Sequence, residues 1–140
     1  FRLISNRNED IYKFLTKWVA HMFQYPGQKN NIAVLIKSQQ GIGKDFLFSI
    51  LSAMIGERHT FNTASMEKEI VGDFNPGLYE KLLVVFNEME GGAGYKYSDK
   101  LKDLITSTHD EINVKNVKKK VNVLSFARYL VFTNNHFPLK

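Results

Sequence analysis

A short glycine-containing segment, residues 38–46, has residue types that could bind phosphate. Its sequence is SQQGIGKDF, and it directly follows the apolar run of residues 32–36. Glycines let backbone N–H groups point into a concavity at a helix N-terminus, and a lysine adds positive charge for the β and γ phosphates. The segment therefore predicts a nucleoside triphosphate site formed by Ser38, Gln39, Gln40, Gly41, Ile42, Gly43, Lys44, Asp45 and Phe46.

This segment departs from the usual G-x-x-x-x-G-K-[ST] pattern at its first and last defined positions. Ser38 replaces the first glycine, and Asp45 stands where Ser or Thr would coordinate magnesium. A carboxylate also binds Mg²⁺ and suits a helix N-terminus, so Asp45 is a candidate metal ligand, directly or through water, although it adds negative charge near the phosphates. The alternative is an ordinary turn at Gly41 and Gly43; the apolar strand before it and the helical pattern after it favour the phosphate loop.

Two further apolar runs, residues 82–86 and 129–132, end in polar residues. These are Asn87, Glu88, Asn134 and Asn135. Ligands of parallel α/β sheets bind at the carboxyl ends of the strands, so Glu88 is a candidate to hold Mg²⁺ or orient an attacking water in phosphoryl transfer. An Asn amide at the other strand end could bind the γ-phosphate or the attacking water. Alternatively, Glu88 is a solvated loop residue and the Asn pair forms a turn.

Four lysines lie close together near the C-terminal end of the sequence: Lys115, Lys118, Lys119 and Lys120. Apolar and polar residues alternate on either side of them, over residues 112–115 and 121–123, which predicts a β-hairpin with the lysines at its tip. Such a tip could contact the phosphates of a nucleic acid strand, and a net charge of +5 suits a polyanionic partner. The alternative is a solvated edge kept soluble by its charge.

The elements that must position these residues alternate between strand and helix. Helical spacing of apolar residues predicts one helix over residues 11–23 and another over residues 46–55, ending at Gly56. A third helix carries Leu101, Leu104 and Ile105, with Ser98 as its N-cap. This order predicts an α/β fold with a largely parallel sheet.

Composition limits the class of protein. The chain has 140 residues, of which 44% are hydrophobic, which suits one domain with its own core, residues 1–140, whose residues 1–30 form a helical lead-in. We expect this domain to be a piece of a longer protein. There is no cysteine and the four histidines are scattered, so we expect neither disulfides nor a zinc site. No apolar run is long enough to span a membrane and no signal peptide is visible, so we expect no membrane contact and a location inside a cell.

The strand ends and the lysine hairpin together resemble a known family. The segments LVVFNEMEGGAG, INVKNVKKKVNV and YLVFTNN follow GIGK in that order, and the lead-in is FLTKWVAHMFQYPGQKNNIAVLIKSQQGIGK. They are similar to the Walker B, pre-sensor hairpin and sensor 1 segments of superfamily 3 viral helicases, above all the helicase part of primase-helicases from large DNA viruses, phages and related mobile elements. The resemblance covers residues 11–139. It implies an AAA+-like P-loop NTPase fold, a three-layer sandwich with a central sheet, an N-terminal helix and a pre-sensor β-hairpin.

The same resemblance implies roles for individual residues. Lys44 matches the Walker A lysine, Glu88 the Walker B acid that holds Mg²⁺, and Asn135 the sensor 1 asparagine, with Asn134 the weaker match. The channel-facing tip would be Lys118, Lys119 and Lys120. Either Lys100 or Lys102 falls in the segment before the hairpin, and the resemblance does not choose between them. No arginine finger can be assigned, since Arg128 lies inside the last strand.

From this resemblance we predict the core of an ATP-dependent DNA helicase, which hydrolyses ATP with Mg²⁺ to move along single-stranded DNA during viral or phage replication. It implies a homo-hexamer with a fused or associated primase, in the host cytoplasm or a replication compartment. An alternative is a nucleic-acid-binding or ring-assembly module that keeps the fold but hydrolyses ATP weakly or not at all, as Asp45 and Asn87 suggest. A small P-loop kinase is a third hypothesis, disfavoured because the sequence has a basic hairpin where a lid is needed.

Overall fold

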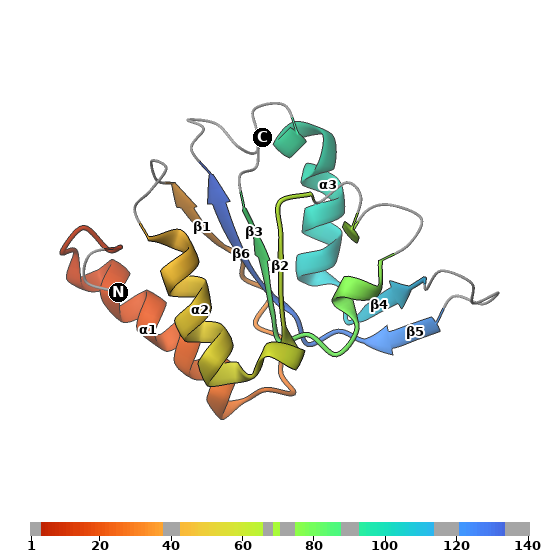
Figure 1. Cartoon of the computed structure of the whole chain (residues 1–140), viewed down its shortest axis with the longest axis horizontal. Helices are drawn as coiled ribbons and strands as arrows, with labels where there is room; N and C mark the ends of the chain where they lie inside the picture. Colours follow the sequence, from red (N-terminus) through yellow and green to blue (C-terminus); the bar gives the residue numbers. More distant parts are fainter. Residues whose placement is uncertain are drawn as a thin grey trace.

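The computed structural model describes residues 4–37, 43–65, 69–70, 75–87, 93–113 and 121–133. Figure 1 shows their arrangement. Along the chain, the elements are α1 (Glu9–Gln24), β1 (Val34–Lys37), α2 (Lys44–Ile55), the 3-10 turn η1 (Glu57–His59), β2 (Thr60–Thr63), the 3-10 turn η3 (Pro76–Leu78), β3 (Leu83–Phe86), α3 (Ala93–Thr106), β4 (His109–Ile112), β5 (Val121–Leu124) and β6 (Arg128–Thr133).

The first helix is amphipathic, as predicted. The Asn8 side chain accepts hydrogen bonds from the backbone N–H groups of Asp10, at 2.9 Å, and Ile11, at 3.1 Å, so it caps the helix. One face of α1 is buried through Leu15, Trp18, Val19 and Met22. Among the helices in the described ranges, none has the length and apolar character needed to cross a membrane.

Four parallel strands form the main sheet in the order β1-β6-β3-β2. The predicted α/β fold with a largely parallel sheet is therefore confirmed. Because β6 lies between β1 and β3, the strands predicted to carry the candidate residues are neighbours and end at the same edge. The edge strand β2 was not predicted, since its sequence TFNT contains one apolar residue and no apolar run.

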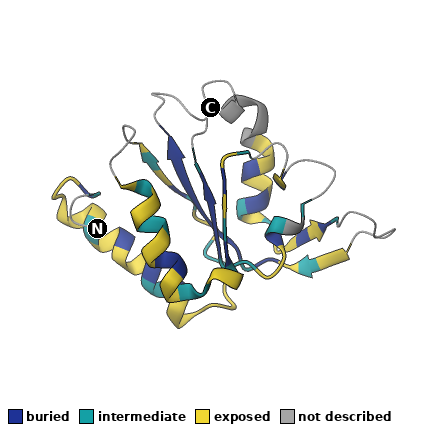
Figure 2. Cartoon of the chain, in the orientation of Figure 1, coloured by how far each residue is buried: buried dark blue, intermediate teal, exposed yellow. Residues whose placement is uncertain are grey.

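Helices cover both faces of this sheet (Figure 1). Successive residues of β3 alternate between two cores: Leu83 and Val85 pack with α1 and α2, and Val84 and Phe86 pack with α3. Figure 2 shows the buried strands between the partly exposed helices. Burial on both faces explains why β3 and β6 are continuous apolar runs in the sequence.

A second, two-stranded sheet pairs β4 with β5 in antiparallel fashion, with His109 opposite Leu124 and Ile112 opposite Val121. Two strands were predicted here, but β4 begins three residues earlier than the predicted strand. The lysine-rich tip, including Lys115, Lys118, Lys119 and Lys120, lies outside the described residues.

Two predicted boundaries were wrong. Helix α3 begins at Ala93, so Ser98 lies inside the helix and does not cap it; serine is only mildly unfavourable in a helix interior and does not stop one. Strand β1 begins at Val34, not at residue 32, because the Ile32 carbonyl accepts a hydrogen bond from the Trp18 indole N–H at 3.1 Å and is thereby tied to α1.

Candidate functional site

The carboxyl ends of β1, β6 and β3 lie side by side. Lys37 is opposite Thr133, and Phe86 is opposite Val131, so the loops that follow these strands leave from one edge of the sheet. Two of the predicted catalytic residues belong to those loops, Glu88 and Asn135, and both lie outside the described residues, as does Asn134. The strands that precede these residues end at one edge of the sheet, as predicted. The positions of the side chains themselves stay predictions.

The N-terminus of α2 stands at this edge. Gly43 is the N-cap, with φ 88° and ψ 27°, and has no side chain to bond the first N–H groups of the helix. A Cβ on Gly43 would meet nothing closer than 4.0 Å, so glycine is needed here for its left-handed backbone and not for space. The first turn of α2 therefore presents unsatisfied N–H groups and the positive end of the helix dipole.

Lys44 is the first residue of this helix, and its ammonium group is buried. The Nζ atom lies 6.0 Å from the centroid of the Phe132 ring on β6 and has no hydrogen-bond partner among the described residues. A buried charge without an acceptor is costly, so the position favours an anion beside it. The remaining predicted phosphate-loop residues, Ser38, Gln39, Gln40, Gly41 and Ile42, lie outside the described ranges.

Asp45 and Phe46 follow on the same turn, and both are exposed. An acid in the first turn is favourable because of the helix dipole, whether or not it binds a metal. Within the described ranges, no three His, Cys, Asp or Glu residues lie close enough to hold a metal ion. The predicted Mg²⁺ ligands Asp45 and Glu88 thus stay a prediction.

The sequence analysis did not predict that Asn62, a polar residue of strand β2, lies beside this edge. The Asn87 backbone N–H donates to the Thr63 carbonyl, and its side-chain amide N–H donates to Asn62 Oδ1, both at 2.8 Å. These bonds fasten the residue after β3 to the neighbouring strand β2. The missed strand β2 is the reason, since Asn62 and Thr63 belong to it.

Arg128 is buried and serves the fold. Its guanidinium donates to backbone carbonyls of Tyr25 (2.7 Å), Pro26 (3.3 Å), Gln28 (2.6 Å) and Phe126 (3.0 Å). Burial lowers the pKa of Arg128 from its ordinary value. Through these bonds Arg128 fastens the loop after α1 to the start of β6, whereas its Nε–H has no hydrogen-bond partner among the described residues.

A second buried polar cluster joins the same loop to α3 and the small sheet. The Lys29 ammonium donates to the carbonyls of Leu104 and Ser107 and to the Ser125 hydroxyl. Burial lowers the pKa of Lys29, and burial raises the pKa of nearby Asp110. These charges are structural and lie away from the N-terminus of α2.

The family resemblance did not choose between two lysines of α3, Lys100 and Lys102, and both are exposed. Lys102 forms an ion pair with Asp99 at 3.0 Å, one turn earlier on the helix. Lys100 is close enough for its positive charge to lower the pKa of Asp110, which partly opposes the effect of burial. Neither contact favours one lysine over the other for an external ligand, so the choice stays open.

Comparisons with known proteins give a phage replication protein among the relatives of this chain. The DNA primase-polymerase of Nitratiruptor phage NrS-1 is 29% identical over 125 residues, which make up 87% of this chain and 17% of that protein. An apo structure of the NrS-1 C-terminal region superposes with a TM-score of 0.86 and 27% identity over 99% of this chain. A second apo structure of that region gives a TM-score of 0.83 with 26% identity over 98% of this chain. The chain spans 32% and 33% of those two solved chains.

These relatives contradict the predicted ATP-dependent helicase function. They are a DNA primase-polymerase and the C-terminal region of NrS-1. The prediction depended on a strand, a glycine-lysine turn, a helix and two strands that end in polar residues. The same arrangement binds phosphate in α/β proteins of many different activities, so it does not specify a helicase. The predicted hexamer depended on the same resemblance and stays untested.

A family model also matches the chain, over residues 36–140. The match begins within β1 and includes α2, β2, β3 and β6. Its description is "Family of unknown function (DUF5906)". Since the match covers more than half of the sequence, the chain belongs to the DUF5906 family.

Proposed function

We propose that this chain is a nucleotide-binding part of a phage-type DNA primase-polymerase. In this role it holds a nucleoside triphosphate, such as ATP, by its phosphates at the N-terminus of α2, in an α/β fold of the P-loop kind, and serves DNA synthesis. The relative that supports this is itself a DNA primase-polymerase. The chain matches only 17% of that protein, so the catalytic primase part would lie elsewhere in the same protein or in a partner.

The observation that carries the proposal is the buried Lys44 ammonium. It has no hydrogen-bond acceptor in the described part of the chain and stands beside Gly43, whose left-handed backbone opens the first turn of α2. Helix N–H groups and a lysine are the two donors that phosphate binding requires. A triphosphate would supply the acceptor that Lys44 lacks.

The described residues can bind the phosphates of a nucleotide, but they do not provide enough ligands to bind Mg²⁺ without those phosphates. Asp45 is the only carboxylate in the first turn of α2. Mg²⁺ commonly keeps several waters and binds through one or two carboxylates plus substrate phosphates. We therefore assign Asp45 and the predicted Glu88 as its protein ligands, with the phosphates completing the set.

Binding of a fluorescent ATP analogue with Mg²⁺ tests this proposal. Lys44→Ala is expected to weaken binding by roughly 10- to 100-fold, the equivalent of one hydrogen bond to a charged group. Lys17→Ala is the matched control, since Lys17 is an exposed lysine on α1 and its removal changes the net charge equally. Equal affinities of the two variants would rule out the phosphate site.

A DNA-binding role for the lysines of residues 115–120 is the second part of the proposal. Its support is the charge of this segment and the relative's name. Replacing Lys118, Lys119 and Lys120 with alanine is expected to weaken binding to single-stranded DNA. It should also flatten the dependence of log K on log salt by about 0.7 for each phosphate that the variant no longer neutralises. An unchanged slope would show that these lysines are solvated.

A further inference from the structure

Phe46 is an aromatic side chain that the fold leaves uncovered beside the candidate phosphate site. It is 70% exposed, the largest exposed fraction among the large apolar side chains of the described ranges. It belongs to neither core, whereas the next two residues of α2, Leu47 and Phe48, pack against the core that α2 shares with α1. An exposed ring adds little to the stability of the fold, and most of it is open to a ligand.

The Phe46 side chain starts at the same helix end as the phosphate donors. Phe46 lies in the first turn of α2, and its Cβ is 4.0 Å from the point where a Cβ on the N-cap residue Gly43 would stand. Side chains of an α-helix lean toward its N-terminus, so Phe46 leans toward the N–H groups that would bind the phosphates. A ligand held there by its phosphates therefore has an aromatic side chain within one turn of its anchor.

Lys44 and Phe46 stand on different sides of α2, because residues two positions apart are separated by about 200° around an α-helix. Lys44 faces the sheet: its Nζ lies 6.0 Å from the centroid of the Phe132 ring and has no hydrogen-bond partner among the described residues. Phe46 is on the solvent side. A molecule that contacts both needs a charged end for Lys44 and a flat apolar part for Phe46. A nucleoside triphosphate has these two parts in its phosphates and its base.

We propose that Phe46 stacks on the base of the nucleotide whose phosphates bind at the N-terminus of α2. This inference rests on the proposed phosphate site and deepens it, because stacking distinguishes a nucleotide from an inorganic phosphate. Every base has a π-face, so a stacking contact tolerates all of them. The site therefore selects nucleoside triphosphates as a class over inorganic tripolyphosphate, and it does not select one base.

Calorimetric titrations with two ligands, each in the presence of Mg²⁺, test the base contact: ATP has a base and inorganic tripolyphosphate has none. Phe46→Ala is expected to weaken ATP binding by roughly 5- to 150-fold, the range for the loss of one base–aromatic stack. The same variant should bind tripolyphosphate as tightly as the unaltered chain, which also shows that it is folded. Phe46→Tyr keeps an aromatic ring and should retain the affinity for ATP.

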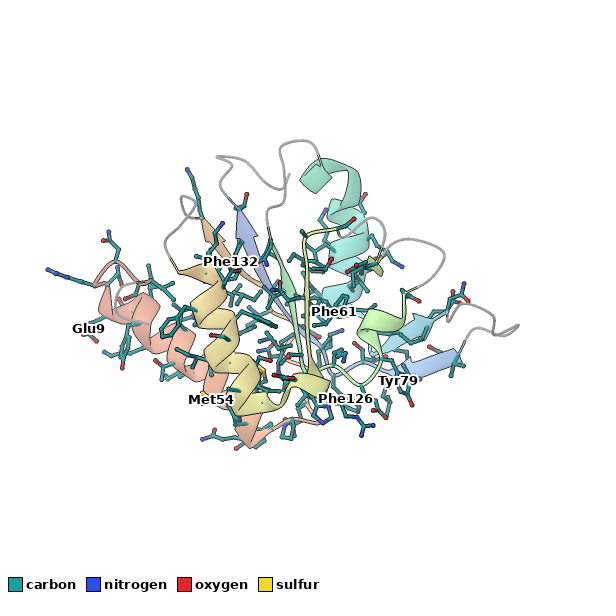
Figure 3. The ribbon with its side chains drawn as sticks, in the orientation of Figure 1. Glu9, Met54, Phe61, Tyr79, Phe126 and Phe132 are labelled. Atoms are coloured by element: carbon teal, nitrogen blue, oxygen red, sulfur yellow. The ribbon has the colours of Figure 1, made fainter. Side chains whose placement is uncertain are left out.

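Met54→Ala is the matched control for the loss of an exposed apolar side chain from α2. Met54 is 59% exposed and lies about 12 Å further along the helix axis than Phe46. Figure 3 shows Phe132 beside the N-terminal half of α2 and Met54 near its other end. Met54→Ala should bind both ligands like the unaltered chain. Equal losses of ATP affinity in Phe46→Ala and Met54→Ala would overturn the inference.

Failure of the base contact and failure of the phosphate site give different results. If Phe46→Ala weakens ATP and tripolyphosphate equally, or weakens neither, while Lys44→Ala weakens both, the phosphate site stands and stacking on Phe46 is refuted. If the unaltered chain binds neither ligand, or Lys44→Ala weakens neither, the phosphate site is refuted and the base contact with it.

Discussion

Arg128 provides the sharpest test of how the fold is held together. It is 1% exposed, and its guanidinium binds four backbone carbonyls, three of them in the loop that follows α1. The three bonds to that loop cross about one hundred residues of sequence and join the loop after the lead-in helix to strand β6. Arg128→Met keeps a long apolar stem and removes every one of these bonds.

The expected loss follows from the acceptors left behind. A buried polar group that loses its partner costs about 1–3 kcal/mol. Phe126 is half-buried, but Tyr25 and Gln28 lie in an exposed loop, so water can replace the guanidinium at part of these carbonyls. Removing the guanidinium also returns the cost of burying its charge. We therefore expect a loss of about 3 kcal/mol in the free energy of unfolding, which lowers Tm by roughly 10 °C.

Urea unfolding followed by circular dichroism measures this loss, and hydrogen exchange of the amides at residues 25–28 locates it. Arg58→Met is the control, because Arg58 is an exposed arginine paired with the exposed Glu80 and should leave the unfolding midpoint unchanged. A loss below about 1 kcal/mol for Arg128→Met, with unchanged exchange in the loop, would show that the guanidinium does not hold α1 to the sheet.

Three further predictions concern stability and use the same urea assay. A Cβ added in Gly77→Ala would lie 2.6 Å from the Phe61 ring and should cost roughly 1–3 kcal/mol; Phe61→Leu should recover part of this, and a fully additive pair would contradict the contact. Burial raises the pKa of Asp110 above its ordinary 3.8, so its contribution to stability is largest below pH 3.8 and is lost as pH rises through the higher folded pKa. Asp110→Asn should remove this decline, and an identical pH profile would refute it. Asn8→Ala should lower the free energy of unfolding by about 1 kcal/mol and Asn8→Ser by much less, because serine can also cap a helix. Equal losses in the two variants would show that the side-chain cap does not stabilise α1.

The helices and buried strands were predictable because their patterns are local. Apolar spacing located α1 and α2, and continuous apolar runs located β3 and β6. The error at β1 came from a contact that no local pattern contains. The start of β1 moved because the Trp18 indole binds the Ile32 carbonyl, fourteen residues away in sequence.

Part of the candidate site was predictable for the same reason. The pair of Gly43 and Lys44 is a local signal, and the structure places it at a helix N-terminus as expected. The elements that lie next to that site depend on the order of the strands in the sheet, and this order cannot be read from the sequence. The role of Arg128 was also hidden, because its acceptors are backbone carbonyls and these have no sequence signature.

The incorrect helicase prediction has a physical cause. A triphosphate is recognised by its charge and its oxygen atoms, so N–H groups and a lysine beside a helix suffice to predict that a nucleotide binds. What happens to the nucleotide depends on the group that attacks it, water in hydrolysis or a sugar hydroxyl in DNA synthesis, and on parts of the protein that hold that group. None of these parts is specified by Gly43 and Lys44. A local phosphate motif therefore supports a ligand class, and only relatives or assays can supply the reaction.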